Sequence, residues 1–307
     1  MRIVFFGTPE FAVPSLEALV AEGAQVVGVV TQPDKPHGRS RSTLVAPPIK
    51  DVAQSHHLPV LQPDRPTGDV FHAALRHWQP ELGIVVAYGH ILRADVLGVP
   101  TRGMINVHAS LLPRLRGAAP VNWAILRGET DTGVTIQQLD TGMDTGPILH
   151  QSATAIEPGE TAGALLHRLA GLGAESLVEA LALMRLGLLR PRAQDSALAT
   201  YAPKFDRTTT RVNWSADSQA VSRRIRAFDP VPGAWTTLGD QELKLFGARP
   251  AAGTGAPGEL LELTPTVRIA TGQDAVEIAE VQPAGKPRMP AAAWGRGHSA
   301  VAGQVVM

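Results

Sequence analysis

RIVFFGTPEFAVPSLEALVAEGAQVVGVV, residues 2–30, is the stretch that decides the fold class of this chain. It begins with an apolar run that ends in glycine, and a second apolar run occupies Val26–Val30. Between the two runs, Leu16, Leu19 and Val20 recur at helical spacing, and a glycine ends the helix. Strand, helix and strand in this order indicate a βαβ unit, in which the two strands run parallel.

The same alternation of strands and helices continues to about residue 189. Strand-like runs occupy Ile84–Ala87, Met104–His108 and Val134–Leu139, and Glu160–Leu186 carries the apolar face of one or two helices. We therefore expect residues 1–189 to form a Rossmann-like α/β domain around a mostly parallel sheet.

The pattern changes in the last third of the chain. Residues 190–204 contain prolines and small polar residues without a sustained period, which predicts a linker. A helix is expected at Ser218–Phe228. Five short apolar runs follow it, at Ala234–Leu238, Leu243–Ala248, Gly258–Leu263, Thr266–Ala270 and Ala275–Val281. Short strands at this spacing predict that residues 205–307 form a small OB-like β-barrel.

Composition limits the class of protein. The 307 residues, 44% hydrophobic and 18% charged, fit a packed protein of two domains, and no segment approaches the roughly 18 apolar residues of a membrane span. The N-terminal residues lack the features of a secretory signal, so we expect a cytoplasmic protein, and we take a monomer as its working state. Because cysteine is absent and the histidines show no ligand spacing, we expect no metal.

Charge is balanced overall but not locally. The formal net charge is zero, yet the stretch from Thr200 to Pro250 holds eight basic and five acidic residues, a net +3. The loop Lys35–Arg41, KPHGRSR, is also basic and is interrupted by proline and glycine. Both features fit contacts with an anionic partner, and both fit an ordinary solvated surface.

The segment INVHASLLP, residues 105–113, is the most informative for function. Residues two apart in a strand share a face, so Asn106 and His108 would present an amide and an imidazole side by side. Because the chain leaves the strand at Ser110–Pro113, both side chains would lie at the strand's carboxyl end, where open α/β sheets bind ligands. An edge strand with two solvated polar residues is the alternative.

A second polar cluster is LDTGMDTGP, residues 139–147, which two glycines and a proline mark as a loop after a strand. Asp144 in this loop could point toward the same carboxyl edge. A carboxylate near an imidazole fixes its tautomer and raises its basicity, as a general base requires. Taken alone, a loop aspartate is more often a turn former.

These segments together resemble the folate-dependent formyltransferases, over nearly the whole chain. The matching stretches are FFGTPEFAVPSLEAL at 5–19, TQPDKPHGR at 31–39, VVAYGHIL at 85–92, INVHASLLPRLRGAAPVNWAI at 105–125, GVTIQQLDTGMDTGPIL at 133–149 and IRAFDPVPGAW at 225–235. The resemblance implies an enzyme that transfers the formyl group of 10-formyltetrahydrofolate, its co-substrate, to the α-amine of methionyl initiator tRNA, for translation initiation.

The resemblance also assigns roles to residues. Its catalytic positions match Asn106, His108 and Asp144, and its folate-contacting positions match Ser110, Leu111, Leu112 and Pro113. Asn106 and His108 are suited to polarising the formyl oxygen, and Asp144 to orienting His108.

The tRNA contacts implied by the resemblance lie in two places. The loop with Arg39 and Arg41 matches an insertion that enters the acceptor end of the tRNA, and Arg223 and Arg224 belong to the basic stretch of the second domain. Three alternatives stay open at this point. They are a formyltransferase acting on an amino sugar, a folate hydrolase that releases formate, and a tRNA-binding module without catalysis.

Overall fold

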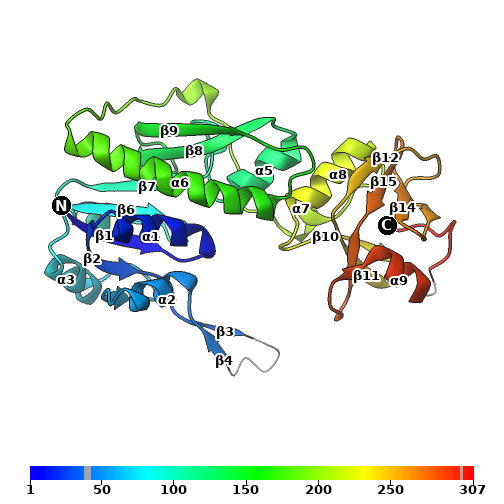
Figure 1. Cartoon of the computed structure of the whole chain (residues 1–307), viewed down its shortest axis with the longest axis horizontal. Helices are drawn as coiled ribbons and strands as arrows, with labels where there is room; N and C mark the ends of the chain where they lie inside the picture. The colour runs from blue at the N-terminus through cyan, green and yellow to red at the C-terminus, as the bar shows by residue number, and fades with distance from the viewer. Residues whose placement is uncertain (38–42, 298–299) are drawn as a thin grey trace. The chain divides into compact units, whose positions relative to one another are not determined.

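The structure is a computed structural model that describes residues 1–37, 43–297 and 300–307, and it divides into two compact units (Figure 1). The first unit comprises Met1–Gly117, Thr132–Thr154 and Leu166–Tyr201. The second comprises Ala118–Asp131, Ala155–Leu165 and Ala202–Met307. Each unit is therefore assembled from segments that are distant in the sequence. The domain boundaries expected at residues 189 and 205 stay a prediction.

The first unit is built on a seven-stranded sheet with the order β5-β2-β1-β6-β7-β8-β9. Its strands are β1 (Arg2–Gly7), β2 (Gln25–Val30), β5 (Val60–Leu61), β6 (Leu82–Val86), β7 (Met104–His108), β8 (Asp131–Gln138) and β9 (Ile148–Ala155). The pairs from β5 to β7 are parallel, and β8 runs antiparallel to β7. The mostly parallel sheet is thus confirmed. Its order turns back between β1 and β6, which opens a ligand crevice at the carboxyl ends of such strands.

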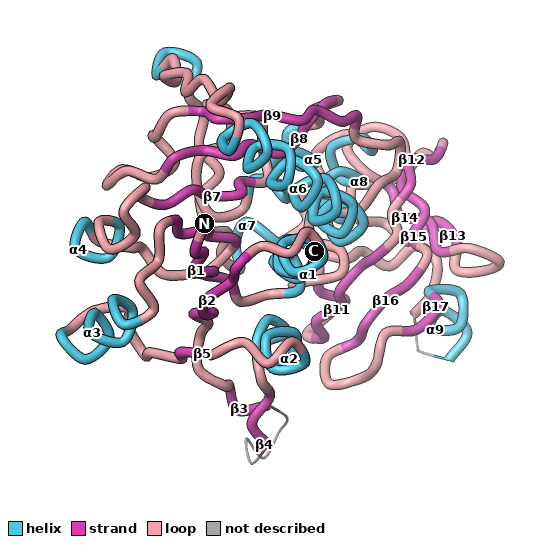
Figure 2. Tube along the Cα trace, turned by 60° about the vertical axis from the view of Figure 1, so that its left-hand side comes forward, coloured by secondary structure: helices cyan, strands magenta, loops and turns pink. Residues whose placement is uncertain are grey.

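Helices cover both faces of this sheet. They are α1 (Val13–Ala21), α2 (Pro48–Ser55), α3 (Asp69–His77), α4 (Ala94–Leu97) and α6 (Ala162–Arg185), and a 3-10 turn, η1 (Glu10–Ala12), precedes α1. In Figure 2, α1 and α6 lie on one face, and α3 and α4 lie on the other. The predicted helix at Glu160–Leu186 is one continuous helix, α6. A short hairpin, β3 (Lys35–His37) and β4 (Thr43–Val45), carries the basic loop, whose residues 38–42 lie outside the described residues.

Strand β7 alternates between the two layers, as its pattern predicts. Met104 is fully buried in a core cluster with Phe6 of β1 and Leu75 of α3, on one face of the sheet. On the other face, Val107 lies against α6 at Gly173, where a Cβ atom would come within 3.0 Å of it. Asn106 and His108 therefore share the face of Met104, at the carboxyl end of the strand.

The second unit consists of helices and antiparallel strands. Its helices are α5 (Pro120–Arg127), α7 (Arg207–Thr210), α8 (Ser218–Ala227) and α9 (Ala291–Gly297). One sheet has the order β10 (Ala234–Leu238), β11 (Gln241–Phe246), β16 (Glu280–Pro283) and β17 (Met289–Pro290). The other has the order β12 (Arg249–Ala251), β15 (Ala275–Ile278), β14 (Val267–Ala270) and β13 (Leu260–Glu262).

The predicted fold class, a mostly parallel α/β sheet followed by a unit of antiparallel strands, is confirmed. One detail differs from the sequence-based expectation. The single run predicted at Ala275–Val281 is split between β15 and β16, which belong to different sheets. A period-two pattern marks buried side chains but not the sheet in which they lie.

No helix within the described ranges is both long and apolar enough to cross a membrane. Nor do His, Asp or Glu side chains in that part of the chain form a group of three that could hold a metal ion.

Candidate active site

Strand β7 presents Asn106 and His108 next to polar partners on β8. Asn106 pairs with Val85 of β6 on one side and with Gln137 of β8 on the other, and His108 pairs with Thr135. His108 is only 6% exposed, whereas Asn106 is half-buried and its amide has no hydrogen-bond partner among the described residues. The two predicted residues therefore lie together. His108 is held in place, and the Asn106 amide is available to a ligand.

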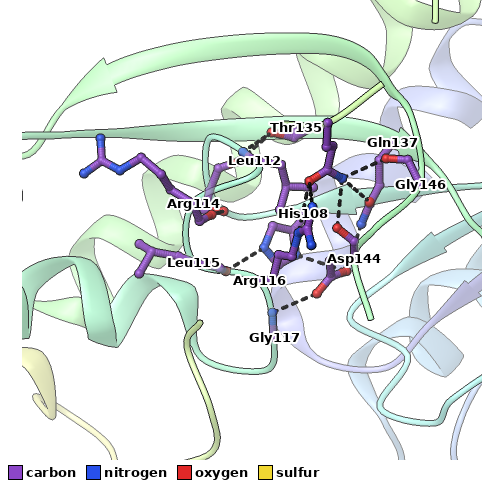
Figure 3. Close-up of polar contacts among 12 residues, drawn as sticks. His108, Leu112, Arg114, Leu115, Arg116, Gly117, Thr135, Gln137, Asp144 and Gly146 are labelled. Carbon is purple, nitrogen blue, oxygen red and sulfur yellow. Dashed lines mark hydrogen bonds and ion pairs between the residues drawn. The ribbon is translucent and has the colours of Figure 1, made fainter. Parts of the chain in front are cut away.

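Both ring nitrogens of His108 face oxygen atoms (Figure 3). Its Nε2 lies 3.1 Å from the carbonyl oxygen of Leu115, and its Nδ1 lies 3.6 Å from Oδ1 of Asp144. A neutral imidazole has one N–H group and can donate to only one of them, whereas an imidazolium can donate to both. The Nδ1 side is slightly beyond ordinary hydrogen-bond distance, so Asp144 faces the imidazole as an ion-pair partner and not through a short hydrogen bond.

Asp144 is held by donors on both carboxylate oxygens. Gln137 Nε2 donates to Oδ1 at 2.8 Å, and the backbone N–H of Gly117 donates to Oδ2 at 2.8 Å. Asp140 shapes the same loop, because its carboxylate accepts the N–H of Gly142 at 2.9 Å and the hydroxyl of Thr145 at 2.7 Å. The loop predicted from the sequence thus brings its aspartate to His108.

Two residues at this site have backbones that most side chains avoid. Leu115, whose carbonyl faces His108, has φ +59°, and Asp144 has φ +55°. Asparagine and aspartate tolerate this left-handed region, but a leucine there is uncommon. Each such residue costs about 1–3 kcal/mol and persists only where its surroundings hold it. The contacts around His108 therefore maintain a backbone that the local sequence would not adopt alone.

The Ser110–Pro113 segment forms a turn tied to β8. The Thr135 hydroxyl donates to the carbonyl of Ser110 at 2.6 Å and accepts the N–H of Leu112 at 3.0 Å. Ser110 and Leu112 are 1% and 3% exposed, whereas Leu111 and Pro113 retain partly exposed surface. The two buried residues fix the turn, and the other two form its accessible wall.

The chain is similar to known proteins over nearly its whole length. Residues 1–181 match the family model for formyl transferase, and residues 204–299 match that for the formyl transferase C-terminal domain. The chain is 47% identical to the methionyl-tRNA formyltransferase of Citrifermentans bemidjiense, over 95% of this chain and 92% of that protein. It is 46% identical to the methionyl-tRNA formyltransferase of Myxococcus xanthus, over 98% and 96%.

The chain belongs to the methionyl-tRNA formyltransferase family.

Solved structures outside this family share the fold. HypX from Aquifex aeolicus, in complex with tetrahydrofolic acid, has a TM-score of 0.68 and 23% identity, over 96% of this chain and 46% of that chain. WlaRD, a sugar 3N-formyl transferase, has a TM-score of 0.68 and 18% identity, over 94% and 99%. At these identities the likeness shows the fold alone.

The candidate site also contains residues that the sequence did not single out. Gln137 is fully buried beside Asp144, Arg116 is 3% exposed, and Gln194 hydrogen bonds to the Asp144 loop. A polar residue inside the apolar run of β8 was a signal for Gln137. No signal marked Gln194, because the stretch around it has no periodicity.

A pocket of about 250 Å³ lies at the same edge of the sheet, where the loops after β1 and β2 meet the β3–β4 hairpin. Its lining is Thr8, Pro9, Gln32, Pro33, Lys35, Pro36, Val45, Ala46, Pro47 and Pro48. The polar members are already paired, since Thr8 and Gln32 donate to the carbonyl of Tyr88 and Lys35 donates to Gln32. The pocket therefore offers mainly apolar surface, much of it proline rings. Burial raises the pKa of the Tyr88 phenol to about 12, so this residue adds no charge near neutral pH.

Of the four arginines expected to contact tRNA, the structure describes only two. Arg39 and Arg41 lie outside the described residues. Arg223 and Arg224 lie on α8 of the second unit, where burial lowers the pKa of Arg224 from its usual value. Arg224 donates to the carbonyls of Thr209 and Arg211, and it lines a pocket of about 510 Å³ in that unit. The assignment of all four arginines to tRNA stays a prediction.

Proposed function

We propose that this chain transfers the formyl group of 10-formyltetrahydrofolate to the α-amine of methionyl initiator tRNA, and that Asn106, His108 and Asp144 carry the reaction. The observation that carries this proposal is the pairing of an imidazole, oriented by Leu115 and Asp144, with the unpartnered amide of Asn106. Family membership supports the substrate pair, since close relatives over nearly the full length carry the name methionyl-tRNA formyltransferase.

The reaction needs a neutral amine, a stabilised oxyanion and a proton for the leaving nitrogen. The amine attacks the formyl carbon, the new C–N bond forms, and the bond to the folate nitrogen breaks. The Asn106 amide donates to the developing oxyanion, an interaction typically worth a few kcal/mol to the barrier. The proton leaves the amine toward the His108–Asp144 pair, and it ends on the folate nitrogen.

The turn after β7 supplies the proposed folate wall. Leu111 and Pro113 offer partly exposed apolar surface, so they contact the folate ring directly. Ser110 and Leu112 are buried and act through the shape of the turn. We thus assign all four predicted residues to the donor site, in two different roles.

The proline-lined pocket is the proposed place for the methionyl side chain. Phe6, Val85 and Asn106 lie in one row across β1, β6 and β7, so the loop after β1 is two strands from the loop after β7. At about 4.8 Å per strand this separation is about 10 Å, and an extended methionine attached at its amine covers about two thirds of it, toward the near edge of the pocket. An apolar pocket favours this side chain over a polar one of similar length.

The remaining features of the proposed function are the tRNA contacts, the cellular location and the oligomeric state. Arg39, Arg41, Arg223 and Arg224 contact the tRNA backbone, and the enzyme works as a cytoplasmic monomer. Gel filtration of the enzyme with and without tRNA tests the stoichiometry, which we expect to be one to one.

One assay separates the proposed function from its rivals. The protein is incubated with 10-formyltetrahydrofolate and methionyl initiator tRNA, an amino sugar, or no acceptor. We expect formyl transfer to the tRNA alone. Formate released at the full rate without acceptor would instead indicate a hydrolase, and formylated sugar would indicate a sugar enzyme.

A further inference from the structure

The segment Arg190–Tyr201 lies between the two family-model matches, which end at residue 181 and resume at residue 204. The sequence predicts a linker here, yet the segment is attached to the first unit at both ends. Near its start, Arg192 and Ile148 of β9 exchange two backbone hydrogen bonds of 2.8 Å. Near its end, the carbonyl of Thr200 accepts the N–H of Arg116 at 2.8 Å. We call residues 190–201 the strap.

Gln194 of the strap holds the loop that carries Asp144. Its Nε2 atom donates to the carbonyl oxygen of Asp144 at 2.8 Å and to that of Gly146 at 2.7 Å. At Gly146 a Cβ atom would lie 1.8 Å from the carbonyl oxygen of Gln138, so the loop passes too close to β8 for a side chain. The two contacts from Gln194 thus fix the backbone on both sides of the turn.

Arg116 decides which way the Gln194 amide points. Its Nε and Nη2 atoms both donate to Oε1 of Gln194, at 3.1 and 2.8 Å. A guanidinium can only donate, so the amide oxygen must face Arg116 and the NH2 group must face the Asp144 loop. No carboxylate in the described part of the chain lies within ion-pair distance of Arg116, although it is 3% exposed. The two bonds from the buried guanidinium therefore hold the Gln194 amide in one orientation.

The strap also holds the other oxygen that faces His108. The hydroxyl of Thr200 accepts the N–H of Leu115 at 2.9 Å, and the carbonyl of Leu115 faces His108 Nε2. Leu115 is the residue with the left-handed backbone, so it needs such a restraint. One segment therefore secures both neighbours of the imidazole, Leu115 through Thr200 and Asp144 through Gln194.

We propose that the strap is part of the catalytic apparatus, with Gln194, oriented by Arg116, and Thr200 as positioning residues for Asp144 and Leu115. This inference rests on the proposed function. Misplacing a reacting group by about 1 Å can lower the rate about 100-fold without weakening substrate binding. The strap should therefore affect kcat and leave KM for both substrates unchanged.

The test compares Gln194→Ala, Gln194→Glu and Thr200→Val with two controls. Gln194→Glu keeps the shape and the contact with Arg116 but removes both donors to the loop. Thr200→Ser keeps the hydroxyl that Thr200→Val removes, and Leu198→Ala changes an exposed strap residue, 62% exposed, that faces solvent. We expect kcat to fall about 10- to 100-fold for the first three variants, and to stay near that of the unmodified enzyme for the two controls.

A purely structural role would lower the melting temperature and leave kcat intact at temperatures where the variant is folded. Wild-type kcat for Gln194→Glu in folded protein would overturn the proposal, as would equal kcat for Thr200→Val and Thr200→Ser. A crystal structure of Gln194→Ala gives a readout independent of activity, and we expect a displaced Asp144. An undisplaced Asp144 would refute the strap's role even if the enzyme proved to use another acceptor. If Asp144 is displaced in the variant but the wild-type enzyme does not formylate tRNA, only the proposed function is refuted.

Discussion

The carboxyl edge of the first unit and the arginine-rich surface of the second hold their polar groups in opposite ways. At the edge, His108 and Gln137 are buried, and the two residues whose oxygens face the imidazole, Leu115 and Asp144, are each held by a further hydrogen bond. On the second unit, Arg207 and Arg211 lie over the ring of Trp235, at 4.2 and 5.2 Å from its centre, and Arg207 is largely exposed although it also pairs with Glu242.

The contrast fits the roles that we propose for the two regions, proton transfer at the carboxyl edge and tRNA binding on the second unit. Proton transfer depends on distances of a few tenths of an ångström, so its groups must be locked before the substrate arrives. Attraction to a phosphate backbone depends on charge over several ångströms, so its groups can adjust. Substitutions in the two regions should therefore differ in size and in kind.

The largest loss of activity is expected from substitutions at the carboxyl edge of the first unit's sheet. His108→Ala and Asn106→Ala should lower kcat/KM by about 10²–10⁴-fold, because general acid–base catalysis and oxyanion stabilisation are removed. Binding of tRNA should be nearly unchanged, since neither residue is among those proposed to contact the tRNA backbone. Steady-state kinetics and filter binding measure both quantities. Loss of tRNA affinity in both variants would erase the distinction between the two regions.

A smaller effect, on the order of 100-fold in kcat, is expected for Asp144→Asn. The amide keeps the size of the side chain, but its NH2 group must face one of the two donors, Gln137 or Gly117, and the charge that faces His108 is lost. The KM for folate should change little, and circular dichroism should show a folded enzyme. An Asp144→Asn variant with full turnover would show that the carboxylate has no catalytic part.

The arginines should give modest effects that depend on salt. Arg39→Ala, Arg223→Ala and Arg224→Ala are expected to weaken productive tRNA binding while folate binding stays the same. Each lost phosphate contact should reduce the slope of log affinity against log salt by about 1. Arg185→Ala, on the exposed end of α6, is a matched control of equal charge. A salt slope identical in all four variants would refute the assignment.

The smallest effect is expected from a surface pair near the hairpin. Hydrogen bonds from Gln62 and then from Lys50 lower the pKa of Asp34 below its usual 3.8. Because the folded-state pKa is depressed, the pair stabilises the fold above about pH 3.8, and this contribution is lost as pH falls through the lower folded-state value. Lys50→Met should thus be slightly less stable than the wild type in urea at pH 6. The difference should vanish in strong acid, and a difference that persisted there would point to lost packing instead.

The polar residues at the carboxyl edge were largely predictable from the sequence, whereas the residues that hold them were not. Asn106 and His108 follow from a period of two in one strand, and Asp144 from a loop with two glycines after the next strand. Both signals are local, because strand alternation and turn chemistry depend on neighbouring residues. Gln194 reaches Asp144 from fifty positions along the chain, and no local pattern records such a contact.

In the second unit, too, the local sequence pattern does not record long-range contacts. Strand β10 was predicted with its observed bounds, but the run at Ala275–Val281 proved to serve two sheets. The alternation of apolar side chains recorded that these residues are buried. It did not record which strand each half pairs with.

By itself, the sequence determined the order of strands and helices, the mostly parallel sheet, and the residues that the carboxyl edge presents, since all of these depend on the periodicity of short segments. Only the tertiary structure decided how they are held. It folds the strap back onto the sheet, so that Arg116 orients Gln194 and Thr200 restrains Leu115. These contacts join residues far apart in the chain, and hydrogen-bond geometry in a packed interior has no counterpart in linear spacing.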